Sequence, residues 1–272
     1  MARVDFLIPG MQKAGTTVLA AFLGAHERIF MSQRKELHFF DRETDGFWDA
    51  PDYTAYEASF ADAAPDQLCG EATPIYTFWP GALDRIHAYN PQMRHIVIIR
   101  DPVARAYSGW RMEYATKCDP LDFAETIRAG RDRVVGPDAT ERAMRQYTYV
   151  ERGFYDVQIE ALFSRFDPSQ ILVLLNEALK NDHRASLDRV TRFLGLPDFQ
   201  PYPRRKRVQP DRIRKAARVH RRLASTAPLD PADAAYLRDI YRDSIERTMA
   251  LTGLDLKHWL AEDRGSATQD GA

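Results

Sequence analysis

A short stretch near the N-terminus constrains this chain more than any other. An apolar run from Phe6 to Ile8 leads into a turn that ends at Gly15, and a helix-forming segment follows from Thr16 to Leu23. A strand that turns tightly into a helix presents the first N–H groups of that helix, which have no partner inside it, to an anion. The stretch therefore predicts a phosphate-binding loop at the carboxyl end of a strand, in which Lys13 supplies charge.

The turn is not a Walker A loop. That motif requires a lysine directly before its serine or threonine, whereas here Gly15 precedes Thr16 and Lys13 lies two positions earlier. A glycine-containing β–α turn with a solvated lysine is the alternative interpretation. The candidate anion-binding residues of the loop are Gly10, Gln12, Lys13, Ala14, Gly15, Thr16 and Thr17.

The rest of the chain alternates strand-like and helix-like segments. Strands are expected at 4–8, 28–32, 67–71, 95–99 and 170–175, and Gly70 weakens the third of these. Continuous apolar runs indicate strands that are buried on both faces and are hence parallel. Helices are expected at 16–23, 80–89, 103–116, 154–166 and 186–194. We therefore predict an α/β fold: a P-loop-like, doubly wound parallel sheet of about five strands with helices on both faces.

Length and composition indicate one globular unit without an obvious macromolecular partner. The net charge of −1 over 272 residues gives no field that favours nucleic acid or a membrane surface. No apolar segment reaches the length of about 18 residues that a membrane span needs, and no signal-peptide pattern opens the chain, so a cytoplasmic setting is expected. We expect one domain over residues 1–264 and a disordered tail over 265–272. Neither Cys69 nor Cys118 has a metal-ligand spacing, no metal is implied, and the oligomeric state is left open.

A second informative stretch runs from Lys35 to Asp41. If the backbone is extended here, Glu36 and His38 point to the same face, which places two proton-transfer groups together beside aromatic side chains. A surface loop whose phenylalanines pack into the core is the alternative.

A third stretch starts at Arg100, directly after the apolar run at 95–99. Pro102 is well placed to begin a helix, and Ser108 lies about two turns further along it. Arg100 and Ser108 could bind a second anion at the same edge of the sheet. The alternatives are an ion pair between Arg100 and Asp101 and a serine packed between helices. Asp101 as a magnesium ligand is disfavoured because the loop is not Walker A.

Together the three stretches resemble the sulfotransferases that use 3′-phosphoadenosine 5′-phosphosulfate (PAPS), in particular their heparan-sulfate-type branch. The loop around Lys13 is similar to the 5′-phosphosulfate motif, residues 100–108 to the 3′-phosphate motif, and residues 35–41 to the acceptor-side segment. Residues 71–76 and 152–155 match two further segments, and the resemblance extends from about residue 4 to residue 196. Ala72 departs from that branch, which usually carries a lysine at this position.

The resemblance implies transfer of a sulfuryl group from PAPS to an acceptor hydroxyl, or less readily an amine, which leaves adenosine 3′,5′-bisphosphate (PAP). It implies Glu36 as general base, Lys13 as the cation that stabilises the leaving phosphate, and His38 as a donor to the sulfuryl oxygens. It also implies a late basic loop over the nucleotide. The candidates there are Arg205, Lys206 and Arg207.

The acceptor is expected to be a neutral or weakly charged small molecule, such as a glycoside, a lipid or a specialised metabolite. Ala72 removes a positive charge, and aromatic faces suit rings and acyl chains. The predicted lining is Phe39, Phe40, Asp41, Tyr76 and Trp79, with Phe47, Trp48 and Phe78 nearby. Core packing of these aromatics is the alternative. A P-loop-type kinase or NTPase, and a non-catalytic nucleotide-binding scaffold, are the alternative functions.

Overall fold

The structure is a computed structural model that describes residues 3–43, 46–115, 119–135, 139–204 and 228–261. The chain divides into two compact units, one of residues 1–100 with 157–209 and one of residues 101–156 with 210–272. The single domain expected over residues 1–264 stays a prediction, and the expected tail lies outside the described residues.

The first unit contains the predicted five-stranded parallel sheet, with the strand order β2-β3-β1-β4-β5. The strands are β1 (Phe6–Leu7), β2 (Ile29–Met31), β3 (Leu68–Glu71), β4 (Arg94–Ile99) and β5 (Ile171–Leu175). β1 is shorter than expected, although its pairing with β3 continues on both sides. The Asp5 N–H donates to the Cys69 carbonyl at 2.9 Å and the Ile8 N–H to the Glu71 carbonyl at 2.8 Å.

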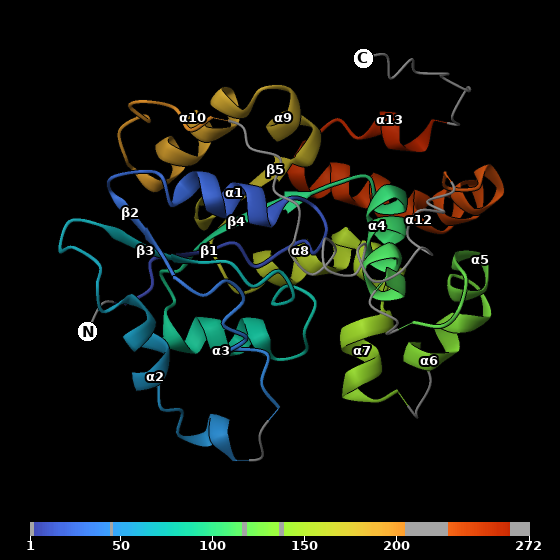
Figure 1. The fold of residues 1–272 in the computed structure, drawn as a ribbon, viewed down its shortest axis with the longest axis horizontal. Helices are drawn as coiled ribbons and strands as arrows, with labels where there is room; N and C mark the ends of the chain where they lie inside the picture. The colour runs from blue at the N-terminus through green and yellow to red at the C-terminus, as the bar shows by residue number, and fades with distance from the viewer. Residues whose placement is uncertain (1–2, 44–45, 116–118, 136–138, 205–227, 262–272) are drawn as a thin grey trace. The chain divides into compact units, whose positions relative to one another are not determined.

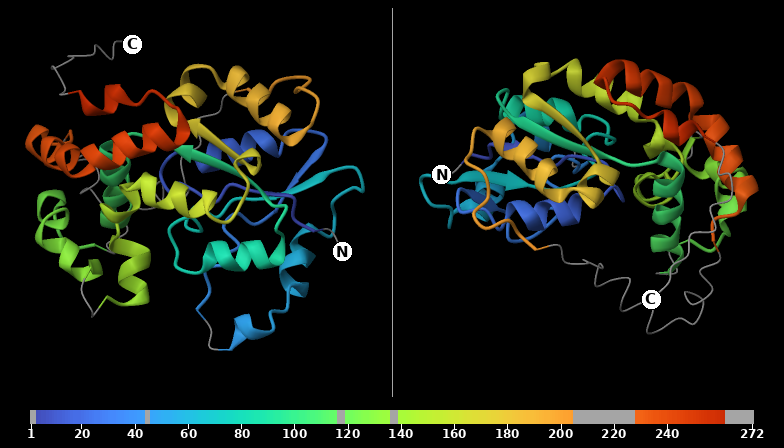
Figure 2. Two further views of the ribbon diagram at one scale, coloured as in Figure 1. Left: turned by 180° about the vertical axis from the view of Figure 1, so that it is seen from behind. Right: turned by 90° about the horizontal axis from the view of Figure 1, so that it is seen from above.

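Helices cover both faces of the sheet, as the continuous apolar strands predict. Figure 1 and the view from above in Figure 2 place α1 (Thr16–Leu23) and α10 (His183–Leu194) on one face and α3 (Ala82–Tyr89) on the other. α10 starts earlier than expected because the Asp182 side chain accepts from the Ala185 N–H at 3.0 Å, and it ends at Leu194 as predicted, with Gly195 as its C-cap. The remaining helices of this unit are η1 (Phe47–Asp49), α2 (Thr54–Glu57), η2 (Ala58–Phe60), η5 (Pro168–Gln170) and α9 (Asn176–Asn181), and α8 (Tyr155–Phe163) has residues in both units.

Gly70 interrupts the apolar run of β3, and the packing around it explains why a glycine stands at this position. The register pairs it with Phe6 on β1. A Cβ atom at position 70 would lie only 2.2 Å from the Phe6 ring. The ring thus occupies the space that any other residue would need, and the glycine is part of the strand's packing.

The second unit, as far as it is described, is helical. Its helices are α4 (Pro102–Ala115), α5 (Phe123–Thr126), η3 (Ala129–Arg131), α6 (Asp132–Val135), α7 (Glu141–Tyr147), η4 (Glu151–Gly153), α12 (Pro231–Thr252) and α13 (Lys257–Leu260). The Tyr241 hydroxyl of α12 donates to the Val150 carbonyl at 2.8 Å, and Asp156 accepts from Ser244 and Arg247. These bonds join α12 to residues 150–156. None of the described helices is long and apolar enough to cross a membrane.

Candidate active site

The loop between β1 and α1 is fastened to the sheet at the carboxyl end of the strands. The Met11 N–H donates to the Ile98 carbonyl of β4 at 2.8 Å, and the Ile98 N–H donates to the Gly10 carbonyl at 3.1 Å. The Ala14 N–H closes the turn on the Met11 carbonyl at 3.1 Å. The loop therefore lies where the sequence predicts an anion site, between two central strands.

Gly15 is required by both its backbone angle and its surroundings. Its φ is 105°, in the region that favours glycine, and it stands at the N-cap of α1. A Cβ atom here would lie 2.6 Å from the Asn176 Nδ2 atom. Asn176 is buried at the start of α9, and its amide donates to the Ala14 carbonyl at 2.6 Å. This side chain holds the loop from the side of β5.

The first turn of α1 suits an anion. No side chain among the described residues caps it, and it carries no acidic residue. The Val18 and Leu19 N–H groups both bond the Gly15 carbonyl, whereas the N–H groups of Thr16 and Thr17 have no carbonyl one turn earlier in the helix. The positive end of the helix dipole lies at the same place.

Arg100 reaches this loop from the end of β4. Its Nη1 atom donates to the Lys13 carbonyl at 3.2 Å, so the guanidinium lies at the predicted edge of the sheet. Ser108 lies in α4, within the second unit, and its pairing with Arg100 around one anion stays a prediction. Arg205, Lys206 and Arg207 lie outside the described residues.

The backbone at Glu36 and His38 is not extended, so the condition under which the sequence places both side chains on one face is not met. Their φ angles are 61° and 53°, both left-handed. The two side chains nevertheless approach one another, with His38 Nε2 at 3.8 Å from Glu36 Oε2. His38 Nδ1 lies 2.8 Å from Asp41 Oδ2, and the Lys35 ammonium hydrogen-bonds the Glu36 carboxylate. The two groups are therefore close to one another although the backbone between them is not extended.

These contacts set the protonation states of the pair. Burial raises the pKa of Glu36, but the nearby His38 ring and the charge and hydrogen bond of Lys35 outweigh it and lower that pKa to about 2. The hydrogen bond of His38 to Asp41 and the nearby Glu36 carboxylate raise the pKa of His38 to about 9, against the effect of burial. At neutral pH the lowered pKa keeps Glu36 as a carboxylate, which is free to accept a proton although it is a weak base, and the raised pKa keeps His38 as an imidazolium.

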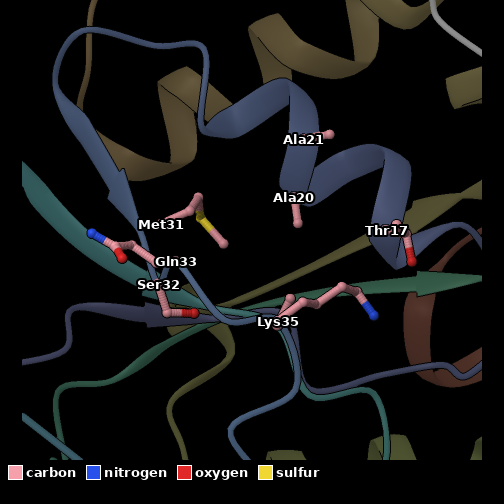
Figure 3. A pocket seen from close by; sticks show the side chains of 8 residues that line it. Thr17, Ala20, Ala21, Met31, Ser32, Gln33 and Lys35 are labelled. Carbon is pink, nitrogen blue, oxygen red and sulfur yellow. The ribbon is translucent and has the colours of Figure 1, made fainter. Parts of the chain in front are cut away.

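A pocket of about 230 Å³ lies beside α1. The residues that line it are Thr17, Ala20, Ala21, Met31, Ser32, Gln33, Lys35 and Ala72. Figure 3 shows that they come mainly from α1, β2 and the segment after β2, and that the Lys35 side chain extends toward the end of α1 that carries Thr17. The pocket thus joins the first turn of α1 to the lysine that binds Glu36.

The aromatic residues expected around the acceptor are mostly core residues. Phe39, Phe40, Tyr76 and Trp79 are buried. The ring of Phe40 lies 5.5 Å from that of Tyr76, measured between centroids, and none of the four lines the pocket. Their burial favours the alternative of core packing, and their role in binding an acceptor stays a prediction, as does that of the buried Asp41.

Two further residues of this region, Asn176 and Lys35, are functional candidates that were not predicted from the sequence. Asn176 follows the apolar run of β5 just as Arg100 follows that of β4, and the same signal could have found it. Lys35 precedes the predicted base directly, but only the structure shows that it lines a pocket. Within the described parts of the chain, no group of three or more His, Cys, Asp or Glu side chains could hold a metal ion.

Comparison with known proteins places this geometry in a family. A family model described as Sulfotransferase domain matches residues 3–219. Heparan sulfate glucosamine 3-O-sulfotransferase 3B1 of Mus musculus is 31% identical over 194 residues, which cover 70% of this chain and 45% of the relative. Bifunctional heparan sulfate N-deacetylase/N-sulfotransferase 1 of Homo sapiens is 27% identical over 286 residues, which cover 94% of this chain and 31% of the relative. The chain spans less than half the length of these two relatives.

A solved structure agrees with the match. The crystal structure of a sulfotransferase from Alicyclobacillus acidocaldarius superposes with a TM-score of 0.76 at 25% identity, over 96% of this chain and 100% of that one. The region matched by the family model contains the loop at 10–17, the segment at 35–41 and Arg100. This chain belongs to the sulfotransferase domain family.

Proposed function

We propose that this chain moves a sulfuryl group from PAPS to a hydroxyl, or less readily an amine, of a small-molecule acceptor. One observation carries the proposal: a single pocket extends from the uncapped first turn of α1 to Lys35, whose ammonium binds the Glu36 carboxylate. Thr17 of the proposed anion site and Lys35, the neighbour of the proposed base, line this pocket together, and this supports a transfer reaction, which needs the two groups near one another.

The residues around the loop fit the phosphosulfate end of PAPS. The close approach of Gly15 to Asn176 leaves no room for a side chain at that position, and the first turn of α1 favours negative charge. Residues 10–17 would hold the 5′-phosphosulfate, with Lys13 stabilising the charge that develops on the leaving phosphate. Arg100 and Ser108 are the proposed contacts of the 3′-phosphate. PAPS, when bound, supplies the sulfuryl group and its leaving phosphate.

Glu36 is the proposed general base. It is the deprotonated member of the Glu36–His38 pair at neutral pH, because the pKa of His38 is about 9 and that of Glu36 about 2. His38, as an imidazolium held by Asp41, can donate to the sulfuryl oxygens but cannot accept the acceptor proton. The proton of the acceptor would move to a Glu36 carboxylate oxygen, which Lys35 and His38 orient.

The pocket supports a small acceptor of low charge. Its volume of about 230 Å³ is below the range of about 300–1,000 Å³ that is typical for drug-sized ligands. Ala20, Ala21 and Ala72 give it a small apolar surface, and the Lys35 charge is balanced by Glu36. We therefore propose that the acceptor inserts one ring or one chain segment of a glycoside, a lipid or a specialised metabolite.

Two measurements test this function. Calorimetry of the full chain with PAP and with ATP should show tight PAP binding and weak ATP binding. The reverse order would favour a kinase or NTPase, and binding of neither would favour an inactive relative that only holds a partner. An acceptor screen with labelled PAPS should then give transfer to simple glycosides or phenols, with activity retained in EDTA. A strong preference for a sulfated glycan would contradict the proposed acceptor class.

A further inference from the structure

The segment that carries Glu36 and His38 is tied to the end of β3 by its backbone N–H groups. The Glu36 N–H donates to the Ala72 carbonyl at 3.2 Å. The Leu37 N–H donates to the side chain of Glu71, and the Phe39 N–H donates to the Tyr76 hydroxyl at 3.0 Å.

Glu71 is the centre of this arrangement. Its carboxylate is fully buried and also accepts from the Tyr56 hydroxyl at 2.9 Å, from the Tyr76 hydroxyl at 3.1 Å and from the Thr73 hydroxyl. With the Leu37 N–H these are four donors, as many as a carboxylate has acceptor positions, and they act against the burial that raises the pKa of Glu71. The Tyr76 hydroxyl works in both directions, since it accepts from the Phe39 N–H and donates to Glu71.

A left-handed backbone is costly for residues other than glycine and persists where the surroundings hold it. Glu36 and His38 both have this conformation, and Leu37, the residue between them, bonds Glu71 directly. Removing a partner from a buried N–H leaves that group unsatisfied, so the backbone at Leu37 would move to find another acceptor. The positions of the Glu36 and His38 side chains therefore depend on a carboxylate that touches neither of them.

We propose that Glu71 is a positioning residue for sulfuryl transfer: its buried carboxylate fixes the backbone between Glu36 and His38, so that the base and the imidazolium face one another. The inference rests on the proposed function, in which Glu36 is the base. It adds a residue that contacts neither donor nor acceptor, and whose effect on the reaction is transmitted through Leu37 and Tyr76.

The test compares E71Q and Y76F with the unchanged chain. The Glu71→Gln amide keeps the shape but replaces one acceptor oxygen with a donor, and Tyr76→Phe removes the hydroxyl that joins Phe39 to Glu71. We expect kcat to fall about 10- to 100-fold in E71Q and about 10-fold in Y76F, because small displacements of a base are costly. KM for PAPS should be unchanged, since the phosphate loop is intact.

A second readout is independent of turnover. In an NMR titration of the folded variants, the pKa of His38 should move from about 9 toward its ordinary value of about 6.5, because its contacts with Glu36 and Asp41 loosen. Tyr53→Phe is the matched control: its ring lies 5.7 Å from that of Phe39 in the same aromatic cluster, and kcat and the His38 pKa should stay unchanged.

Folded E71Q and Y76F proteins with unchanged kcat and an unchanged His38 pKa would overturn the proposal. So would a lower kcat with an unmoved His38 pKa, which would mean that Glu71 acts only through stability. If the chain transfers no sulfuryl group at all, the proposed function fails, and a shifted His38 pKa would still support the positioning by Glu71.

Discussion

The phosphate loop and the acceptor-side segment lie in the same unit and use their backbones in opposite ways. In the loop, side chains that follow β4 and β5 bind carbonyl groups: Arg100 binds that of Lys13 and Asn176 that of Ala14. The Met11 and Ala14 N–H groups of the turn are bonded as well, so it is the N–H groups at the start of α1 that face the predicted anion site. In the segment at 36–39, the N–H groups are the bonded ones, held by the end of β3 and the residues after it.

This difference separates two kinds of site. The loop makes a binding site from the backbone itself, so it needs glycine and a helix start, which are local features. The segment places side chains, so its backbone is fixed and its functional groups are Glu36 and His38. Variants of the loop should therefore change nucleotide affinity, and variants of the segment should change turnover.

The largest effect is expected for Glu36→Gln. General-base catalysis contributes about 10²- to 10⁴-fold, so kcat should fall by at least about 100-fold while calorimetry shows unchanged PAP binding. Glu27→Gln, at an exposed position of the same unit, is the control and should behave as the unchanged chain. A Glu36→Gln protein with near-normal turnover would remove the base assignment.

The next effect concerns Arg100→Ala, which should weaken PAPS binding about 10- to 100-fold, as expected for hydrogen bonds to a charged group. The 3′-dephosphorylated analogue, adenosine 5′-phosphosulfate, should lose much less affinity. Equal losses for both ligands would mean that Arg100 serves only to brace the Lys13 carbonyl. Arg34→Ala, at an exposed position, serves as the charge-matched control.

Gly15→Ala should destabilise the fold by about 1–3 kcal/mol and lower PAP affinity. Its φ of 105° does not suit alanine, and the new Cβ atom would meet Asn176 at 2.6 Å. Adding Asn176→Ala relieves the clash but not the backbone strain, so it should restore only part of the stability in urea denaturation. Gly24→Ala at the other end of α1 is the control, because its φ of −66° is ordinary. Equal losses of stability in Gly15→Ala and Gly24→Ala would contradict this explanation.

The smallest effect is a dependence of stability on pH. The pKa of His38 is raised to about 9 by Asp41 and Glu36, so its contribution is fully present below about pH 6.5 and is lost as pH rises through about 9. Glu36 changes stability in the opposite direction with pH. Because its pKa is lowered, its contribution to stability is lost as pH falls toward about 2. The free energy of unfolding should fall between pH 6 and pH 10 less in Asp41→Asn than in the unchanged chain. If the free energy of unfolding falls equally in Asp41→Asn and in the unchanged chain, the His38–Asp41 bond is not the source of the pH dependence.

Much of this protein can be predicted from local sequence. The strand at 95–99, the helix at 16–23 and the C-cap at Gly195 are found where the apolar runs and glycines indicate them. The position of the loop and of Arg100 at one edge of the sheet follows as well, because parallel strands bring their carboxyl ends together. Each of these features depends on neighbours in the chain or on one general rule of sheet topology.

Tertiary structure alone decided the rest. The backbone at Glu36 and His38 is left-handed and not extended. The residues that hold this segment, Glu71 and Tyr76, are more than thirty residues away in sequence, so the local sequence does not indicate the conformation. The same holds for Gly70, whose missing side chain makes room for Phe6 on another strand. A non-glycine residue accepts a costly backbone angle only when distant groups hold it there, and no local pattern records which distant groups those are.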